Sequence, residues 1–118
     1  MTHQITRGDI YYAVLDPAIG SEQDGIRPCL IVQNNIGNRH SPTTQIIPLT
    51  TQHKKNTLPT HVQISSVCGL DANSIALAEQ LRTIDKSRLG RYVGRIGTDE
   101  QTAIDKSLAI SIGLEVAA

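Results

Sequence analysis

The pattern that decides the fold lies in residues 9–32, which read Asp9-Ile-Tyr-Tyr-Ala-Val-Leu-Asp-Pro-Ala-Ile-Gly-Ser-Glu-Gln-Asp-Gly-Ile-Arg-Pro-Cys-Leu-Ile-Val32. Apolar and polar residues alternate from Asp9 to Leu15, which predicts a half-buried strand ended by Asp16-Pro17. The apolar run Cys29–Val32 predicts a buried central strand. Between the two runs lies a polar segment rich in turn-forming residues. We therefore expect a strand, a long loop and a second strand.

Short strands also dominate the remainder of the chain. We expect them at residues 45–49, 61–64, 74–84 and 92–96, separated by a polar connection at 33–42, an exposed loop at 54–56 and a turn at Gly69. Asp85 is placed to cap a single helical turn that ends at Gly90. This many short strands favours a small barrel or a curled sheet.

One helix is expected at the C-terminal end of the chain. Thr98-Asp-Glu-Gln101 has the spacing of a capping box, in which Thr98 is the N-cap and Gln101 reaches back to it. Ile104, Leu108 and Ile112 then recur every four residues, and Gly113 ends the helix. The predicted class is α+β, mainly β, with a C-terminal helix, and the length of 118 residues fits a single domain over residues 1–118.

Composition excludes several classes of protein. The net charge is zero, and the chain has no Phe, no Trp and three Tyr, so neither a genome-wide DNA binder nor an aromatic stacking module for RNA is expected. Cys29 and Cys68 do not form a disulfide framework. No leader-like or membrane-spanning apolar stretch is present, so we expect a cytoplasmic protein with no membrane association.

The sequence carries few signs of metal or cofactor chemistry. The histidines at 3, 40, 53 and 61 have no metal-ligand spacing, and there is no Cys-x-x-Cys pair. Gly-rich phosphate loops and a Gly-x-Ser-x-Gly motif are also absent from the sequence. We therefore expect no metal and no cofactor.

Polar residues at strand ends are the remaining candidates for a site. Arg27 stands where the long loop meets a buried strand, and Thr50 ends another strand. An Arg fork can stabilise phosphoryl oxygens, and RNA supplies its own nucleophile in the 2′-hydroxyl. By themselves these positions are more often surface residues. The basic segment with Arg82, Lys86, Arg88, Arg91 and Arg95 could hold RNA phosphates or solvate a barrel rim.

Several segments together resemble the MazF/PemK family of toxin endoribonucleases. They are Arg7-Gly-Asp-Ile-Tyr-Tyr12, Gly20-Ser-Glu-Gln-Asp-Gly-Ile-Arg-Pro28, Val32-Gln-Asn-Asn-Ile-Gly-Asn38, Leu58-Pro-Thr-His61, and Ser74 through Glu79-Gln-Leu-Arg-Thr-Ile-Asp85. The resemblance extends from Arg7 to the C-terminal Ile-Gly-Leu, which is nearly the whole chain.

The resemblance implies both a fold and an activity. The fold would be a small SH3-like β-barrel of the MazF/PemK/CcdB type, forming a homodimer. The activity would be metal-independent cleavage of single-stranded mRNA at short motifs, outside the ribosome, leaving a 2′,3′-cyclic phosphate and a 5′-hydroxyl. The expected partner is a cognate antitoxin whose acidic, disordered C-terminal segment occupies the RNA cleft.

Site residues follow from the resemblance position by position. The catalytic Arg and Thr of the family fall on Arg27 and Thr50, and the RNA-binding set is Ser21, Glu22, Gln23, Gln80 and His61. Because Arg stays protonated, we expect Arg27 to stabilise phosphoryl charge, and to serve as a proton donor to the leaving oxygen, rather than to act as a general base.

Alternatives remain at the other positions. Glu22 and Gln23 could simply be loop solubilisers, Gln80 could satisfy a neighbouring backbone group, and His61 could be either a general base or a partly buried strand residue. The alternative function is a gyrase-poison-like, protein-binding toxin on the same barrel. The end of the chain, Leu-Glu-Val-Ala-Ala without an aromatic residue, argues against it.

Overall fold

The computed structural model describes residues 4–51 and 58–116; the loop predicted at 54–56, His3 and His53 lie outside this range. The strands are β1 (Asp9–Val14), β2 (Ile26–Ile31), β3 (Thr43–Thr50), β4 (His61–Ile64), β5 (Ser74–Leu77), β6 (Arg82–Asp85) and β7 (Leu89–Arg95). The helices are α1 (Asn35–His40) and α2 (Thr98–Ser111), with 3₁₀ turns η1 (Ser66–Cys68), η2 (Ala78–Gln80) and η3 (Lys86–Arg88). The mainly β class with a C-terminal helix is therefore confirmed.

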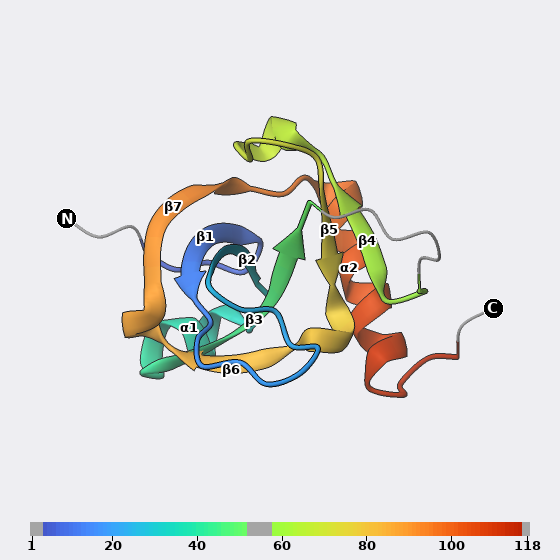
Figure 1. The fold of residues 1–118 in the computed structure, drawn as a ribbon. Coiled ribbons are helices and arrows are strands. Elements are labelled where there is room, and N and C mark those ends of the chain that lie inside the picture. The colour runs from blue at the N-terminus through green and yellow to red at the C-terminus, as the bar shows by residue number, and fades with distance from the viewer. Residues whose placement is uncertain (1–3, 52–57, 117–118) are drawn as a thin grey trace.

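The strands form one antiparallel sheet in the order β4-β5-β3-β2-β1-β7, and β6 pairs with β3 beside β5. In Figure 1 the sheet curls, so that β6 and β7 pass around β1, β2 and β3 while α2 lies beside β4 and β5. Across the described residues β6 and β7 are not paired with each other, so the strands do not close a barrel. The SH3-like barrel stays a prediction, as does the single domain over residues 1–118.

The central strands are buried on both faces. One cluster, the helix-side core, packs the sheet against α2 and contains Ile10, Leu30, Ile47, Leu49, Ile64 and Ile104. The other, the barrel-side core, fills the inside of the curl and contains Tyr11, Ala13, Leu15, Cys29, Ile31, Ile46 and Ile84. Successive residues of β2 and β3 enter opposite cores because strand side chains alternate. Both described cysteines are free thiols, as the sequence predicted.

Helix α2 begins one residue earlier than a Thr98 cap requires. Its N-cap is Gly97, whose N–H donates to Oε1 of Glu100 at 3.1 Å, and Oε2 of Glu100 accepts from the N–H of Ser65 at 2.8 Å. Burial acts to raise the pKa of Glu100, but these two backbone bonds hold it below its usual range. The predicted roles of Thr98 and Gln101 were wrong, because the tertiary contact to Ser65 favours Glu100.

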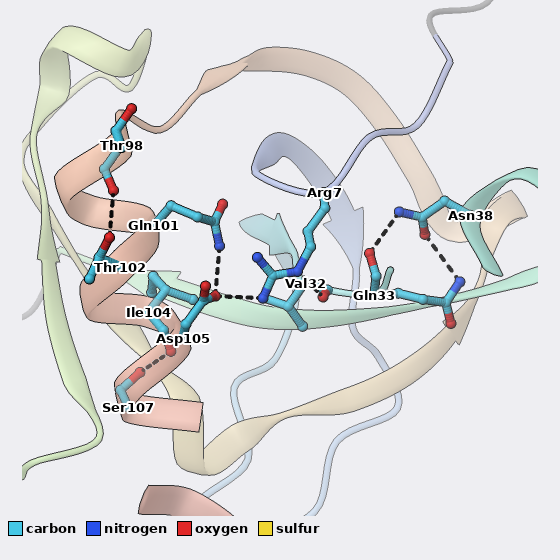
Figure 2. A network of polar contacts seen from close by, with 10 residues as sticks. All are labelled: Arg7, Val32, Gln33, Asn38, Thr98, Gln101, Thr102, Ile104, Asp105 and Ser107. Carbon is cyan, nitrogen blue, oxygen red and sulfur yellow. Dashed lines mark hydrogen bonds and ion pairs between the residues drawn. The ribbon is translucent and has the colours of Figure 1, made fainter. Parts of the chain in front are cut away.

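Figure 2 shows how α2 is tied to the sheet. The Arg7 guanidinium donates to Oδ1 of Asp105 at 2.6 Å and to the Val32 carbonyl at 2.9 Å, and Gln101 donates to the same Asp105 carboxylate at 3.0 Å. Gln101 thus supports an ion pair rather than a cap. No helix in the described part of the chain is long and apolar enough to span a membrane.

Two predicted segments have a different structure. The polar connection at 33–42 contains α1, where Asn34 caps the N–H of Gly37 and the buried Asn38 side chain bonds Gln33 and Thr44. The predicted strand at 74–84 is interrupted by η2, so it forms two strands, β5 and β6, rather than one. β3 pairs with β5 before this break and with β6 after it, and the turn lets the chain change register between them.

Candidate functional site

The register of the neighbouring strands β2 and β3 relates the positions of Arg27 and Thr50. The two strands pair as far as Cys29 opposite Pro48, and continuing that register by two residues would place Arg27 opposite Thr50. Facing residues of an antiparallel pair point to the same side of the sheet. The Arg27 and Thr50 positions therefore share the face that carries Cys29 and the barrel-side core.

The environments of the two side chains differ. Thr50 is 4% exposed, where β3 also pairs with Ile75 of β5. Arg27 is partly exposed; its Nε donates to the Asp24 carbonyl at 2.7 Å, and its Nη2 lies 3.5 Å from Oδ1 of Asp24. Burial raises the pKa of Cys29 to about 12, while the charges of Arg82 and Arg27 act in the opposite direction. Both guanidinium charges therefore act on this thiol, although Arg27 is also paired with Asp24.

Gln80 joins the long loop to the rest of the sheet. Its Oε1 accepts from the N–H of Gln23 at 2.8 Å, and its Nε2 donates to the Ser21 carbonyl at 3.3 Å. Glu22 turns inward along the loop, where its Oε1 accepts from the N–H of Ile19 at 2.6 Å. The structure thus brings Gln80, Ser21 and Gln23 together. We call Asp16–Gly25 the site loop.

Glu79 is a charged group of the site that the sequence analysis did not select. His61 Nε2 lies 2.9 Å from Oε2 of Glu79, and the Thr60 hydroxyl donates to Oε1 at 2.9 Å. Burial acts to raise the pKa of Glu79, but hydrogen bonds from His61, its own backbone N–H and Thr60 lower it overall. The sequence analysis placed Glu79 inside one continuous strand at 74–84, whereas it lies in the turn η2.

The ring orientation of His61 is fixed from both sides. Its Nδ1 accepts from the N–H of Leu58 at 3.2 Å, so the ring proton belongs on Nε2, which faces Glu79. The side chain is 3% exposed, although it stands on the edge strand β4. Both nitrogens therefore have partners, and neither presents a free lone pair to a ligand.

Two cavities flank the Arg27 and Thr50 positions. One, of about 190 Å³, lies between the site loop and η2 and is lined by Leu15, Glu22, Gln23, Pro48, Glu79, Gln80, Leu81 and Arg82. The other, of about 370 Å³, is lined by Asp24, Gly25, Ile26, Arg27, Pro28, Leu49 and Thr51. The two cavities share the site loop and the C-terminal half of β3. We call the two cavities together the site cleft. Its lining is polar and carries charges of both signs: Arg27 and Arg82 are cationic, and Glu22, Asp24 and Glu79 are anionic.

Most of the basic segment has structural partners. Arg82 donates to the Leu15 carbonyl at 3.2 Å, and Arg88 donates to the carbonyls of Val14 and Asp16 at 3.1 and 2.7 Å. The Arg91 guanidinium lies over the Tyr12 ring, 4.9 Å from its centre. These contacts fix the end of β1 and the start of the site loop. Among the described residues, no group of three or more His, Cys, Asp or Glu side chains could hold a metal ion.

Comparison with known proteins assigns the chain to a family. The family model described as "PemK-like, MazF-like toxin of type II toxin-antitoxin system" matches residues 6–112. The chain belongs to the PemK/MazF toxin family. Endoribonuclease EndoA of Bacillus subtilis (strain 168) is 45% identical to this family member over 111 residues, covering 93% of this chain and 96% of the relative. The resemblance stated from the sequence is confirmed.

Solved structures agree with this assignment of the PemK/MazF chain. An endoribonuclease from a mycobacterial species, in complex with its cognate antitoxin, is 30% identical with a TM-score of 0.80, over 96% of this chain and 99% of that one. MazF from Deinococcus radiodurans is 23% identical with a TM-score of 0.82, over 95% and 99% of the two chains. The second comparison concerns the fold, which is MazF-like.

Proposed function

We propose that this PemK/MazF-family toxin is an endoribonuclease that cleaves single-stranded RNA, at particular sequences, without a metal ion and independently of the ribosome. The observation that supports the proposal is the register of β2 with β3, which pairs Cys29 with Pro48 and, continued by two residues, sets Arg27 opposite Thr50 beside the site cleft. The names of relatives, endoribonucleases at 45% and 30% identity, support the same activity.

The proposed reaction is an internal transesterification. The 2′-oxygen of the ribose attacks the adjacent phosphorus and loses its proton, while the bond from phosphorus to the 5′-oxygen breaks and that oxygen takes up a proton. The products are a 2′,3′-cyclic phosphate and a 5′-hydroxyl. DNA lacks the attacking hydroxyl and is not cut. Arg27 stabilises charge on the phosphoryl oxygens and is placed to supply the proton to the leaving oxygen, and Thr50 orients the phosphate.

The proton acceptor in this proposal is Glu79. Its carboxylate is ionised at neutral pH, lies in the site cleft beside Gln80, and accepts a single side-chain hydrogen bond on each oxygen. Each carboxylate oxygen can accept more than one bond, so a lone pair remains for the 2′-hydroxyl. His61 then acts through Glu79 as a positioning residue rather than as the base.

The RNA-contacting set of the proposal is Ser21, Glu22, Gln23 and Gln80. His61, which was also expected in this set, acts through Glu79 because both of its ring nitrogens have partners. In the present structure the Gln80 amide holds the site loop with both its oxygen and its nitrogen. RNA bases would therefore meet the loop surface first, and the second N–H of the Gln80 amide remains for a base while the loop bonds are kept. Sequence preference would then depend on the loop as well as on Gln80.

Assembly belongs to the same proposal. We expect a homodimer in the cytoplasm and a cognate antitoxin whose acidic segment lies across the site cleft. The guanidinium groups of Arg27 and Arg82 in the cleft are suited to pair with the carboxylates of such a segment. The mycobacterial relative in complex with its own antitoxin is a precedent for such a partner.

Cleavage of a long unstructured RNA by the purified chain in EDTA tests the function directly, and mapping both ends of each product reports the chemistry. We expect Arg27→Ala to lower the cleavage rate by about a hundredfold or more, because it removes a charge that acts on the transition state. Arg91→Ala is the matched control, since Arg91 is an exposed cation that lies over Tyr12. Cleavage that needs added metal, or an Arg27→Ala variant with full activity, would contradict the mechanism.

A further inference from the structure

A further cavity, separate from the two of the site cleft, lies at the end of the barrel-side core that is away from Arg27. It has a volume of about 640 Å³ and is lined by Gln4, Ile5, Tyr11, Asn38, Arg39, Lys86, Leu89, Gly90 and Tyr92. We call it the α1–β7 pocket. Along β1, Ala13 pairs with Arg27, whereas Tyr11 pairs with Cys29 and Tyr92. The pocket is therefore displaced along the strands from the Arg27 position, and it shares no lining residue with the site cleft.

One wall of the α1–β7 pocket is aromatic and apolar. The rings of Tyr11 and Tyr92 meet edge to face with their centres 5.4 Å apart. Tyr92 keeps 37% of its surface exposed, and the partly buried side chains of Ile5 and Leu89 continue the wall. An exposed aromatic face inside a concave apolar wall is suited to a planar ring.

The other side of the pocket is cationic. Arg39 is exposed, and among the described residues its side chain makes no hydrogen bond or ion pair. The Lys86 ammonium donates one hydrogen bond to the Asn38 carbonyl, which leaves two of its three donors. No Asp or Glu lines the pocket, and the carboxylate of the nearby buried Asp9 is held by Arg95 at 2.9 Å. An anion placed here would meet two positive charges.

We propose that the α1–β7 pocket binds a nucleotide, with the base against Tyr92 and the apolar wall, and the phosphate on Arg39 and Lys86. The volume lies within the range of small-ligand sites and is far larger than a phosphate alone needs. A planar ring joined to an anion matches the two sides of the pocket. This site goes beyond the proposed RNA cleavage, because it uses neither Arg27 nor Thr50.

Titration of the full chain with adenosine monophosphate, followed by nuclear magnetic resonance, tests the proposal. We expect saturable shifts in the amides of residues 38–40 and 89–92. Adenosine and inorganic phosphate should each bind about tenfold more weakly, since each fills half of the pocket. A 5′-phosphorylated, uncleavable DNA trinucleotide then distinguishes a site for free nucleotides from a site for a chain end.

Variants locate the bound nucleotide. Arg39→Ala and Tyr92→Leu should each weaken binding by about tenfold. Arg91→Ala is the matched control, because this neighbouring exposed cation does not line the pocket. Arg27→Ala should bind normally, so that loss of RNA cleavage and loss of nucleotide binding are separated.

Three results would overturn the proposal. The first is the absence of saturable shifts at millimolar nucleotide. The second is binding of inorganic phosphate as tight as that of the nucleotide, which would leave the aromatic wall without a role. The third is binding that Arg39→Ala leaves unchanged while Arg27→Ala abolishes it, which would assign the nucleotide to the site cleft.

Discussion

At the scale of single residues, the imidazole of His61 orders the carboxylate of Glu79. Its Nε2 faces Oε2 of Glu79 at 2.9 Å, while the N–H of Leu58 fixes the other ring nitrogen. The Thr60 hydroxyl supplies a further bond to Glu79. Hydrogen bonds to the charged form of a carboxyl favour that form, which is why the pKa of Glu79 lies below its ordinary value.

His61→Ala should raise the pKa of Glu79, because the variant removes the strongest of the interactions that lower it. Carbon-detected nuclear magnetic resonance of the Glu79 carboxyl measures the shift. His61→Gln is the conservative comparison, because a side-chain amide can still donate to Glu79. If His61→Ala leaves the Glu79 titration unchanged, the ring does not position the carboxylate.

The same carboxyl makes stability depend on pH on the acid side. A carboxyl whose pKa is lowered on folding contributes stability that is fully present above its unfolded pKa, about 4.3 for Glu. That contribution is lost as the pH falls through the lowered folded pKa. The difference in unfolding free energy between the wild type and Glu79→Gln should therefore be constant near neutral pH and shrink below about pH 4. Urea unfolding across this range measures it, and a difference that grows toward acid would contradict the assignment.

At the scale of elements, the site loop and η2 are coupled through one amide. The Gln80 side chain bonds the backbone at Gln23 and at Ser21, residues more than fifty positions away in the sequence. η2 fixes Gln80 because the turn lies between the pairings of β3 with β5 and with β6. The conformation of the loop is therefore set from the sheet rather than by the loop alone.

Gln80→Ala should loosen the site loop. The variant removes the hydrogen bond from the Gln23 N–H to the Gln80 side chain, which is worth about 1 kcal/mol. Hydrogen exchange at the Gln23 amide should therefore become about fivefold faster. Gln63→Ala is the matched control, since Gln63 is an exposed glutamine on β4 with no side-chain hydrogen bond found in the described structure. Equal exchange at Gln23 in the two variants would show that the loop is held by other contacts.

At the scale of the whole molecule, the sheet is stabilised from both sides. The helix-side core fixes α2 against β4 and η2, while the barrel-side core sets the curl that brings the site loop toward η2. Ile104 is fully buried in the helix-side core, whereas Ile112, the C-cap residue where α2 ends, is 59% exposed. The same residue type is thus buried in the middle of the helix and exposed at its end.

Ile104→Ala should lower the free energy of unfolding by about 2–5 kcal/mol, because it leaves a cavity in a packed core. Ile112→Ala should change it by less than about 0.5 kcal/mol. Urea unfolding monitored by circular dichroism compares the two variants. Similar losses in both would mean that the exposed end of α2 is covered in solution, for example by a second copy of the chain.

The sequence by itself determined where most of the strands and the last helix lie, although it joined β5 and β6 into one strand. Three local signals indicated which residues of an element are buried. They are the alternation at 9–15, the apolar run at 29–32 and the four-residue spacing of Ile104 and Leu108. The Asp85 cap was also predictable, since its side chain accepts from the N–H of Ser87 only two residues away. The family was also identifiable from the sequence alone, because its motifs occur in order along the chain.

Only the tertiary structure decided which of these local segments meet. α1 forms where Asn38 is buried against Thr44, and Glu100 replaces Thr98 in capping because it also binds Ser65. Partners such as Gln80 with Gln23, or His61 with Glu79, are chosen by the register of β3 with β5 and β6. Periodicity indicates which face of a segment is apolar. It does not indicate which distant donor will face a given acceptor, because that pairing depends on how the sheet curls.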